Sequence, residues 1–361
     1  MDQVHRERIK AVRRRLEAER ADALLVTHRP NVLYLCGFTG DSGALLVEPY
    51  RTTLFTDGRF TAQAAQEARS VSHVETCPGP LPLGIGALLK KGNTKRVGFD
   101  PNRLTVAQVK ALRTAAGHGI RWAAVSAVVE GLRAVKSPQE IDRMRRAAIL
   151  GSEALQEVFA LLKPGIREFE VGAEIDYKMR RKGAQGPSFE TIVAFGGHAA
   201  LPHARPTARR LRKNELVVLD AGAILADYCC DLTRTVFVGR ASRRVRNWYQ
   251  AVLDAQSAAQ EALKIGVEAG TVDAAARKVL TTAGLERYFV HSTGHGLGLE
   301  VHEEPRLARG QKQKIQAGMV VTVEPGVYVH GVGGIRIEDD VVIHARGAEV
   351  LTNAPHEFME L

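Results

Sequence analysis

The sequence predicts two domains: an α/β amino-terminal domain over residues 1–134 and an α+β carboxy-terminal domain over residues 135–361. Short apolar runs alternate with helical patterns in the first third, which is typical of an α/β sheet. A helix-start signal follows near residue 137. Beyond it, a long helix, a break, a shorter helix and a hairpin occur twice in the same order, which indicates two similar halves with pseudo-twofold symmetry.

The amino-terminal domain begins with an amphipathic pattern. Ile9, Val12 and Leu16 stand at helical spacing among charges and predict a surface helix over residues 6–20. Further helices are expected at 61–68 and 105–116. Asp57 and Arg59 are expected to form a structural ion pair. Apolar, β-prone runs predict strands at 23–26, 32–35, 44–47, 52–56 and 96–99.

The carboxy-terminal domain is predicted to begin with a capped helix. Ser137 is the cap, Pro138 suits the first helical position and Glu140 completes a capping box, so a helix should run from here towards Leu162. A shorter helix is expected at 168–182. The second half repeats this order with helices at 243–263 and 272–282, and residues 162–166 and 263–267 form equivalent joints.

Composition indicates an ordinary globular protein, with 45% hydrophobic and 25% charged residues. The charged amino terminus leads into no signal-peptide core, and no apolar run is long enough to span a membrane. The four cysteines form no spaced framework, which favours a reducing compartment. We therefore expect a soluble cytoplasmic protein that does not bind membranes.

A net charge of +10 raises the question of nucleic acid as a partner. The basic clusters are scattered over several predicted helices and loops, and nearly all lack neighbouring aromatic residues for base stacking. We interpret them as solvated surface, so nucleic acid is not an expected partner.

Two carboxylate pairs dominate the carboxy-terminal domain. Two β-prone runs join near Leu225 and Ala226, and a hairpin about that midpoint places Asp220 opposite Asp231. A second hairpin, folded about the glycine-rich turn at 331–334, places Glu324 opposite Glu338. Like charges opposed across strands destabilise a sheet, and burial would drive one carboxylate to protonate. A cation between them removes both penalties.

A histidine-rich segment lies between the two predicted hairpins. It contains His291, His295 and His302, with glycines that allow a close approach of backbone or ligand. Four carboxylates and one imidazole form a set suited to manganese, with cobalt, zinc or iron as alternatives. Because four carboxylates are too many for one catalytic ion, we expect two divalent ions, bridged by two of the carboxylates.

These motifs resemble the "pita-bread" metallopeptidases, and within them the Xaa-Pro peptidases, over essentially the whole chain. The resemblance rests on six stretches of the carboxy-terminal domain and two of the amino-terminal domain: 220–222 with Tyr228, 231–235, 294–298, 302–303, 324–326, 334–339, 31–38 and 56–60. It implies a creatinase/prolidase-type domain over 1–134, a pita-bread catalytic domain over 135–361, proline-containing peptides as substrates and a homodimer.

The resemblance also implies roles for individual residues. Asp220 would bind one ion, His295 and Glu324 the other, and Asp231 and Glu338 would bridge both. Glu324 is a candidate acceptor for the proton of the attacking water. Four residues match positions that hold the substrate or line the proline pocket, the first two of them also catalytic: His203, His302, His291 and Arg336. Arg336 also fits a second reading, as a partner of a ligand carboxylate.

Two positions depart from the family pattern. Cys230 stands where the family commonly has serine, and His198 stands where a small or amide residue is expected, next to the pocket for the residue before proline. The remaining histidines carry no motif and are expected on the surface or in loops: His5, His28, His73, His118, His330, His344 and His356.

Two peptidase activities fit equally well. Aminopeptidase P removes the first residue from longer peptides, whereas prolidase splits Xaa-Pro dipeptides and needs a cation for the free proline carboxylate; Arg306 is the candidate cation. A non-catalytic peptide- or protein-binding module of the same fold is the alternative from another class. Retention of all five expected ligands disfavours that module, and it also disfavours metal-free chemistry such as creatine amidinohydrolysis.

Overall fold

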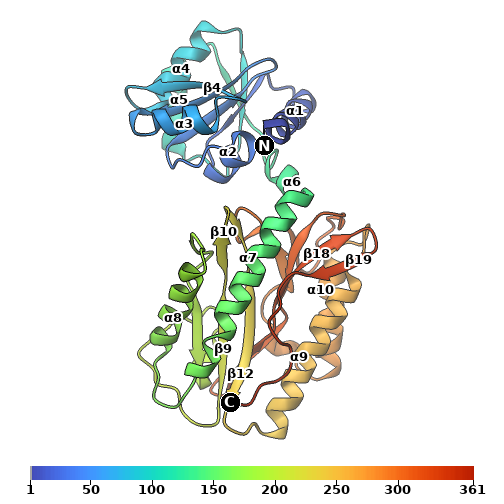
Figure 1. Cartoon of the computed structure of the whole chain (residues 1–361). Helices are drawn as coiled ribbons and strands as arrows, with labels where there is room; N and C mark the ends of the chain where they lie inside the picture. Colours follow the sequence, from blue (N-terminus) through green and yellow to red (C-terminus); the bar gives the residue numbers. More distant parts are fainter. Residues whose placement is uncertain (1) are drawn as a thin grey trace. The chain divides into compact units, whose positions relative to one another are not determined.

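The computed structural model describes residues 2–361, which form two compact units, 1–133 and 134–361 (Figure 1). The amino-terminal unit contains one six-stranded sheet in the order β4-β3-β2-β1-β5-β6. β2 is antiparallel to both β1 and β3, and the other pairs are parallel. The strands are β1 Ala23–Val26, β2 Gly43–Val47, β3 Thr52–Asp57, β4 His73–Cys77, β5 Arg96–Phe99 and β6 Arg121–Ala124.

Helices pack around this sheet, and most of them follow the sequence prediction. Ile9, Val12 and Leu16 are buried under the first helix, as predicted. Arg59 and Asp57 form the expected ion pair, with Nη2 2.9 Å from Oδ2. The sequence analysis missed α4, α6, β4 and β6. The helices are α1 Asp2–Ala18, α2 Arg29–Cys36, α3 Thr61–Glu67, α4 Leu81–Lys91, α5 Val106–Ala116 and α6 Glu130–Arg133.

One predicted strand is wrong, because residues 32–35 lie in helix α2. Pro30 occupies the first turn, and Gly37 ends the helix in the left-handed conformation with its N–H bonded to the Leu33 carbonyl. Val32, Leu35 and Cys36 then recur at helical spacing and are buried. A short apolar run of this kind has no distinguishing period, so the flanking proline and glycine were the better signal.

The carboxy-terminal unit has two halves, each with two helices on its own hydrophobic core. In the first half, α7 contacts β10 and β11, and α8 contacts β8 (Figure 1). Ser137, Pro138 and Glu140 begin α7 as predicted, although it ends at Gln156 rather than near Leu162. The elements are α7 Pro138–Gln156, α8 Glu168–Arg181, β7 Gly186–Pro187, β8 Ile192–Phe195, β9 Glu215–Ala221, β10 Ala223–Leu225, β11 Tyr228–Cys229 and β12 Leu232–Val238.

The second half repeats the order of long helix, short helix and antiparallel strands. α9 and α10 pack on each other, α9 contacts β15 and α10 contacts β14. No helix in residues 2–361 has the length and apolar character needed to cross a membrane. The elements are α9 Arg243–Ala262, α10 Ala269–Thr282, β13 Gly294–Gly296, β14 Glu303–Leu307, β15 Val320–Val323, β16 Gly326–Val329, β17 Gly333–Arg336, β18 Asp339–His344 and β19 Gly347–Val350.

The first carboxylate hairpin differs in register from the prediction. Its turn is at Ala226 and Asp227, both with positive φ, so Asp220 lies opposite Thr233 rather than Asp231. A turn displaced by one residue moves the register by two, and side chains alternate faces with period two. Asp231 is therefore a diagonal neighbour of Asp220 on the same face.

The second carboxylate hairpin has the predicted register. β15 pairs with β18 through Val323 and Asp339, and β16 pairs with β17 through Gly326 and Arg336. The two strand pairs are centred on the same point of the sequence. Glu324 and Glu338 lie between these two pairs and are therefore opposite each other.

Candidate active site

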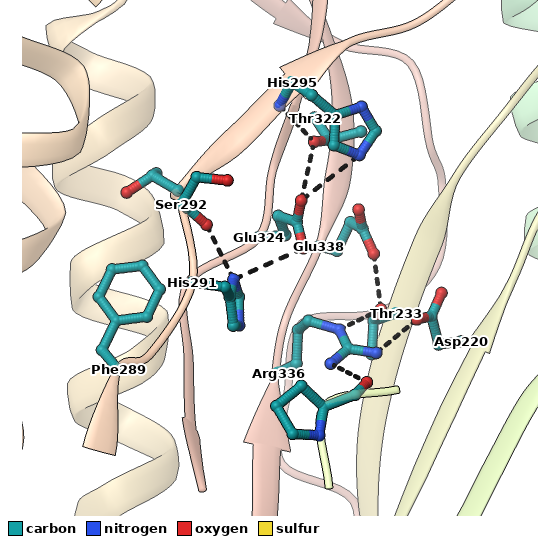
Figure 2. Close-up of polar contacts among 12 residues, drawn as sticks. Asp220, Thr233, Phe289, His291, Ser292, His295, Thr322, Glu324, Arg336 and Glu338 are labelled. Atoms are coloured by element: carbon teal, nitrogen blue, oxygen red, sulfur yellow. Dashed lines mark hydrogen bonds and ion pairs between the residues drawn. The ribbon is translucent and has the colours of Figure 1, made fainter. Parts of the chain in front are cut away.

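All five predicted ligands lie together in the carboxy-terminal unit, in strands or directly beside strands of both halves. Figure 2 shows four of them, Asp220, His295, Glu324 and Glu338. Asp231, His295 and Glu338 each offer a ligand atom within 4.8 Å of the other two. His295 Nε2 lies 3.5 Å from Glu324 Oε1 and 3.7 Å from Asp231 Oδ2. Asp220 is close enough for its charge to raise the pKa values of Asp231, Glu324 and Glu338. The fold therefore gathers the residues that the sequence placed on two separate hairpins.

His295 presents one nitrogen to this cluster. Its Nδ1–H donates to the Gly296 carbonyl at 3.0 Å, which leaves the lone pair of Nε2 directed at the carboxylates. Burial, together with His302, lowers the pKa of His295 to about 4, so the ring is neutral at pH 7. The neighbouring glycines permit the tight strand packing, since a Cβ on Gly294 would lie 1.9 Å from the Thr322 carbonyl oxygen. This confirms the close backbone approach predicted from the glycines.

The burial of the carboxylates and their closeness to one another favour the binding of a cation. Burial and mutual repulsion raise the pKa values of Asp231 and Glu338 well above their usual range. Burial raises the pKa of Glu324 to about 7. Oδ1 of Asp220 and Oδ1 of Asp231 are buried without a hydrogen-bond partner in the structure. Unpartnered buried oxygens beside a neutral imidazole fit the coordination of divalent metal ions.

Arg336 pairs with Asp220, one of the predicted ligands, which agrees with the second of its two expected roles. The guanidinium is 3% exposed and pairs with Asp220 through Nη2 (Figure 2). Nε donates to Thr233 Oγ1 at 3.0 Å, and Nη1 donates to the Tyr328 hydroxyl at 2.6 Å. All three nitrogens are engaged, so the side chain has one defined orientation.

His291 belongs to the same hydrogen-bonded chain. Its Nδ1–H donates to the Ser292 carbonyl at 2.8 Å, and Nε2 accepts from the Tyr328 hydroxyl at 2.8 Å. Burial, with Arg336 nearby, lowers the pKa of His291 to about 3. Its Nδ1 also lies 3.9 Å from Glu324 Oε2. The neutral ring thus connects Tyr328 and Arg336 with the metal-site carboxylates.

His203 and His302 are the more exposed histidines of the group. The ring of His302 lies 4.3 Å from that of His295, centroid to centroid. Burial, His203 and Arg306 all lower the pKa of His302, and His203 also lowers the pKa of His291. The structure therefore brings all four predicted site histidines into one region beside the carboxylates.

The sequence analysis missed a second layer of acids behind the predicted ligands. Asp340 is buried and accepts the Asp231 N–H at 3.1 Å, while its Oδ1 has no partner in the structure. Asp339 is bound by Arg234 at 2.7 Å and by His356 at 2.6 Å. His356 lies in a loop, as expected, but it also pairs with this buried acid. Their position directly after Glu338 was the available signal, because successive residues of one strand point to opposite faces of the sheet.

The two departures from the family pattern have different surroundings. Cys230 is buried, and its sulfur accepts the Ala223 N–H at 3.2 Å. His198 Nδ1 lies 2.8 Å from Oε1 of Glu168, a carboxylate with no exposed surface. Cys230 thus supports the ligand hairpin, and His198 is tied to helix α8.

Residues 142–345 match the model of metallopeptidase family M24, and residues 8–135 match the creatinase/prolidase N-terminal domain. The chain belongs to metallopeptidase family M24.

Individual relatives cover nearly the whole chain. The solved structure of an Xaa-Pro dipeptidase from Bacillus anthracis is 35% identical with a TM-score of 0.96, covering 99% of this chain and 100% of its own. An Xaa-Pro dipeptidase from Pyrococcus horikoshii is 32% identical over 98% of this chain and 99% of its own length. An X-Pro aminopeptidase structure from Thermotoga maritima is 33% identical with a TM-score of 0.87, covering 96% and 100%.

Proposed function

We propose that this protein is an Xaa-Pro dipeptidase that uses two divalent metal ions, with manganese as the favoured metal. The observation that carries the dipeptidase assignment is the position of Arg306. It lies directly opposite His295 across β13 and β14, so both side chains are on one face of the sheet. Arg306 is exposed, and its charge lowers the pKa values of His295 and His302.

Arg306 distinguishes the two activities by charge. A dipeptide ending in proline presents a free carboxylate near the scissile bond, whereas a longer peptide has a neutral amide there. Within the described chain Arg306 forms no ion pair, so its guanidinium is available for a bidentate contact with a carboxylate. The relatives named dipeptidases agree with this reading.

The ligand assignment follows the arrangement of donors. We propose that Asp220 holds one ion, that His295 and Glu324 hold the other, and that Asp231 and Glu338 lie between both. Two bound ions would supply Lewis acidity, activating a water and stabilising negative charge that develops on the substrate carbonyl. Glu324 lies beside His295 and His291, where a carboxylate could accept a proton from the water and return it to the proline nitrogen.

The histidines complete the substrate side of the site. His203 and His302 are the exposed donors beside the cluster and would bind the carbonyl oxygen of the scissile bond. His291 and Arg336 are held by Tyr328, so they would form a rigid wall next to the proline ring. This division gives the site a charged end at Arg306 and a metal-binding centre.

The proposal is tested with three substrates of one sequence: an Xaa-Pro dipeptide, its carboxy-terminal amide and an Xaa-Pro-Xaa tripeptide. Metal-stripped protein is titrated with manganese, beside an Asp231→Ala control. We expect turnover of the dipeptide only, and none from the control at any metal concentration. In Arg306→Ala the dipeptide kcat/KM should fall about 100-fold, the loss expected for a charge-assisted bidentate contact. Arg306→Lys should recover part of it.

Preferred cleavage of the tripeptide would instead establish an aminopeptidase P, the activity named for the Thermotoga maritima relative. Turnover of none of the three substrates, without metal uptake, would favour a binding module.

We also propose a cytoplasmic homodimer. The four cysteines, all free and buried, suit a reducing compartment. Light scattering of the purified chain at the mass of two copies would support the dimer, and a mass of one copy would contradict it.

A further inference from the structure

The loop over residues 196–206 carries His203 between two fixed ends. It leaves strand β8 at Phe195 and rejoins the domain at Thr207. Glu168, the first residue of α8, accepts the Phe195 N–H at 2.9 Å through Oε1 and the Thr207 N–H at 2.9 Å through Oε2. One buried carboxylate therefore holds both ends of the loop.

His198 joins the same carboxylate from inside the loop. Its Nδ1 lies 2.8 Å from Oε1 and 3.0 Å from Oε2 of Glu168, and the Thr207 hydroxyl donates to Oε2 at 2.5 Å. The Glu168 side chain is 0% exposed, so these donors replace water completely. Each oxygen has more than one partner, which leaves the carboxylate a single orientation.

The far side of the loop is held from the metal site. Arg336 Nη1 donates to the Pro202 carbonyl at 3.1 Å, and Pro202 directly precedes His203. The backbone of His203 thus lies between two anchors: Glu168 with His198 at the loop ends, and Arg336 beside Asp220. The exposed His203 side chain has no hydrogen bond in the described structure that would orient it instead.

We propose that Glu168 and His198 are positioning residues that set the place of His203 for catalysis. This inference rests on the proposed function. The carboxylate closes the loop, and the His198 contact holds its first turn, the 3-10 helix η3 Gly196–Ala200, against α8. A displacement of about 1 Å of a catalytic group costs about 100-fold in rate, so the loop ends control turnover at a distance.

The test is a double-mutant cycle on metal-saturated protein with the Xaa-Pro dipeptide. We expect His198→Ala and Glu168→Gln to lower kcat by about 10- to 100-fold. Metal affinity should not change. In a His203→Ala background the same substitutions should change kcat by less than about twofold, because the residue through which they act is gone. Equal losses in both backgrounds, or no loss in either, would overturn the proposal.

Matched variants separate positioning from general damage. Glu174→Gln makes the same acid-to-amide change on an exposed side of α8 and should behave as wild type. His198→Gln keeps an N–H donor and should recover most of the lost kcat. Glu168→Gln also replaces one acceptor oxygen by an NH2 donor that faces other donors. If that variant does not fold, the His198 variants alone test the proposal.

A second readout does not depend on activity. In metal-free protein, amide hydrogen exchange over residues 196–206 should be faster in His198→Ala than in wild type, with exchange elsewhere unchanged. Unchanged exchange in this loop would contradict the anchoring. If wild type fails to cleave the dipeptide, the proposed function fails, whereas the exchange result still decides whether Glu168 and His198 hold the loop.

Discussion

At the scale of single residues, the acids of the site are unfavourable without a cation. Asp231, Glu324 and Glu338 all have raised pKa values from burial, two of them with strong mutual repulsion. Replacing one of them by a neutral amide removes repulsion but also a proposed ligand. The metal-free protein should therefore become more stable, whereas metal binding and activity should be lost.

The raised pKa values of these carboxyl groups make the stability of the metal-free protein depend on pH. A carboxyl group whose folded pKa is raised contributes stability that is complete below its unfolded pKa and is lost as pH rises through the folded pKa. The lowered pKa values of His291 and His295 act in the opposite direction below pH 6.5. We therefore expect the Tm of metal-free protein to fall between about pH 6.5 and pH 8, where Glu324 titrates. Manganese should raise Tm more at the higher pH.

Differential scanning fluorimetry across this pH range, with and without manganese, measures both effects. Asp231→Asn is the control and should show a shallower decline with pH, because one of the titrating groups is missing. A metal-free Tm that rises over the same range would contradict this account of the site.

At the scale of elements, the turn of the first carboxylate hairpin decides which residue lies opposite Asp220. Ala226 and Asp227 have φ values of 49° and 70°, the conformation of the two-residue turns that match strand twist. Asp227 is held by Gln185, which accepts its N–H at 2.7 Å. Alanine has no such compensation for a left-handed backbone, so Ala226 is the strained position of this turn.

We therefore expect Ala226→Asn to stabilise the protein. Asparagine tolerates the left-handed conformation, and relief of the strain should raise the free energy of unfolding by about 1 kcal/mol. Urea denaturation measures this, with kcat and metal affinity expected to stay at wild-type values. A lower midpoint would show that Ala226 makes a packing contact of greater weight than its backbone strain.

At the scale of the whole molecule, the proposed metal ligands come from both halves of the carboxy-terminal unit. Asp220 and Asp231 come from the first half and the other three ligands from the second, while each half has its own apolar core. Bound metal would therefore stabilise the two halves together. The unit over residues 1–133 contributes none of the proposed ligands.

Hydrogen exchange of the full chain should show this asymmetry. On adding manganese we expect slower exchange in both ligand hairpins and in β13, and unchanged exchange in β1–β6. Protection confined to one hairpin would show that only one half binds the metal.

Much of this protein could be predicted from its sequence, because the relevant signals are local. The Ser137 cap, the amphipathic helices and the reflection of Glu324 on Glu338 depend on neighbours along the chain, and each is present in the structure. The cost of opposing like charges predicted a cation between the four carboxylates, and the family resemblance implied His295 as the fifth ligand.

The tertiary structure decided what depends on distant contacts. Helix α2 is a separate case, because its signals are local: Pro30 in the first turn and the left-handed Gly37 at its end outweighed an ambiguous apolar run. Three long-range contacts join residues that are distant in the sequence. Asp340 accepts the Asp231 N–H, His356 pairs with Asp339, and Glu168 accepts the Phe195 N–H at the start of the His203 loop. Local periodicity carries no information about such pairs, because burial and hydrogen-bond satisfaction are set only when the halves pack.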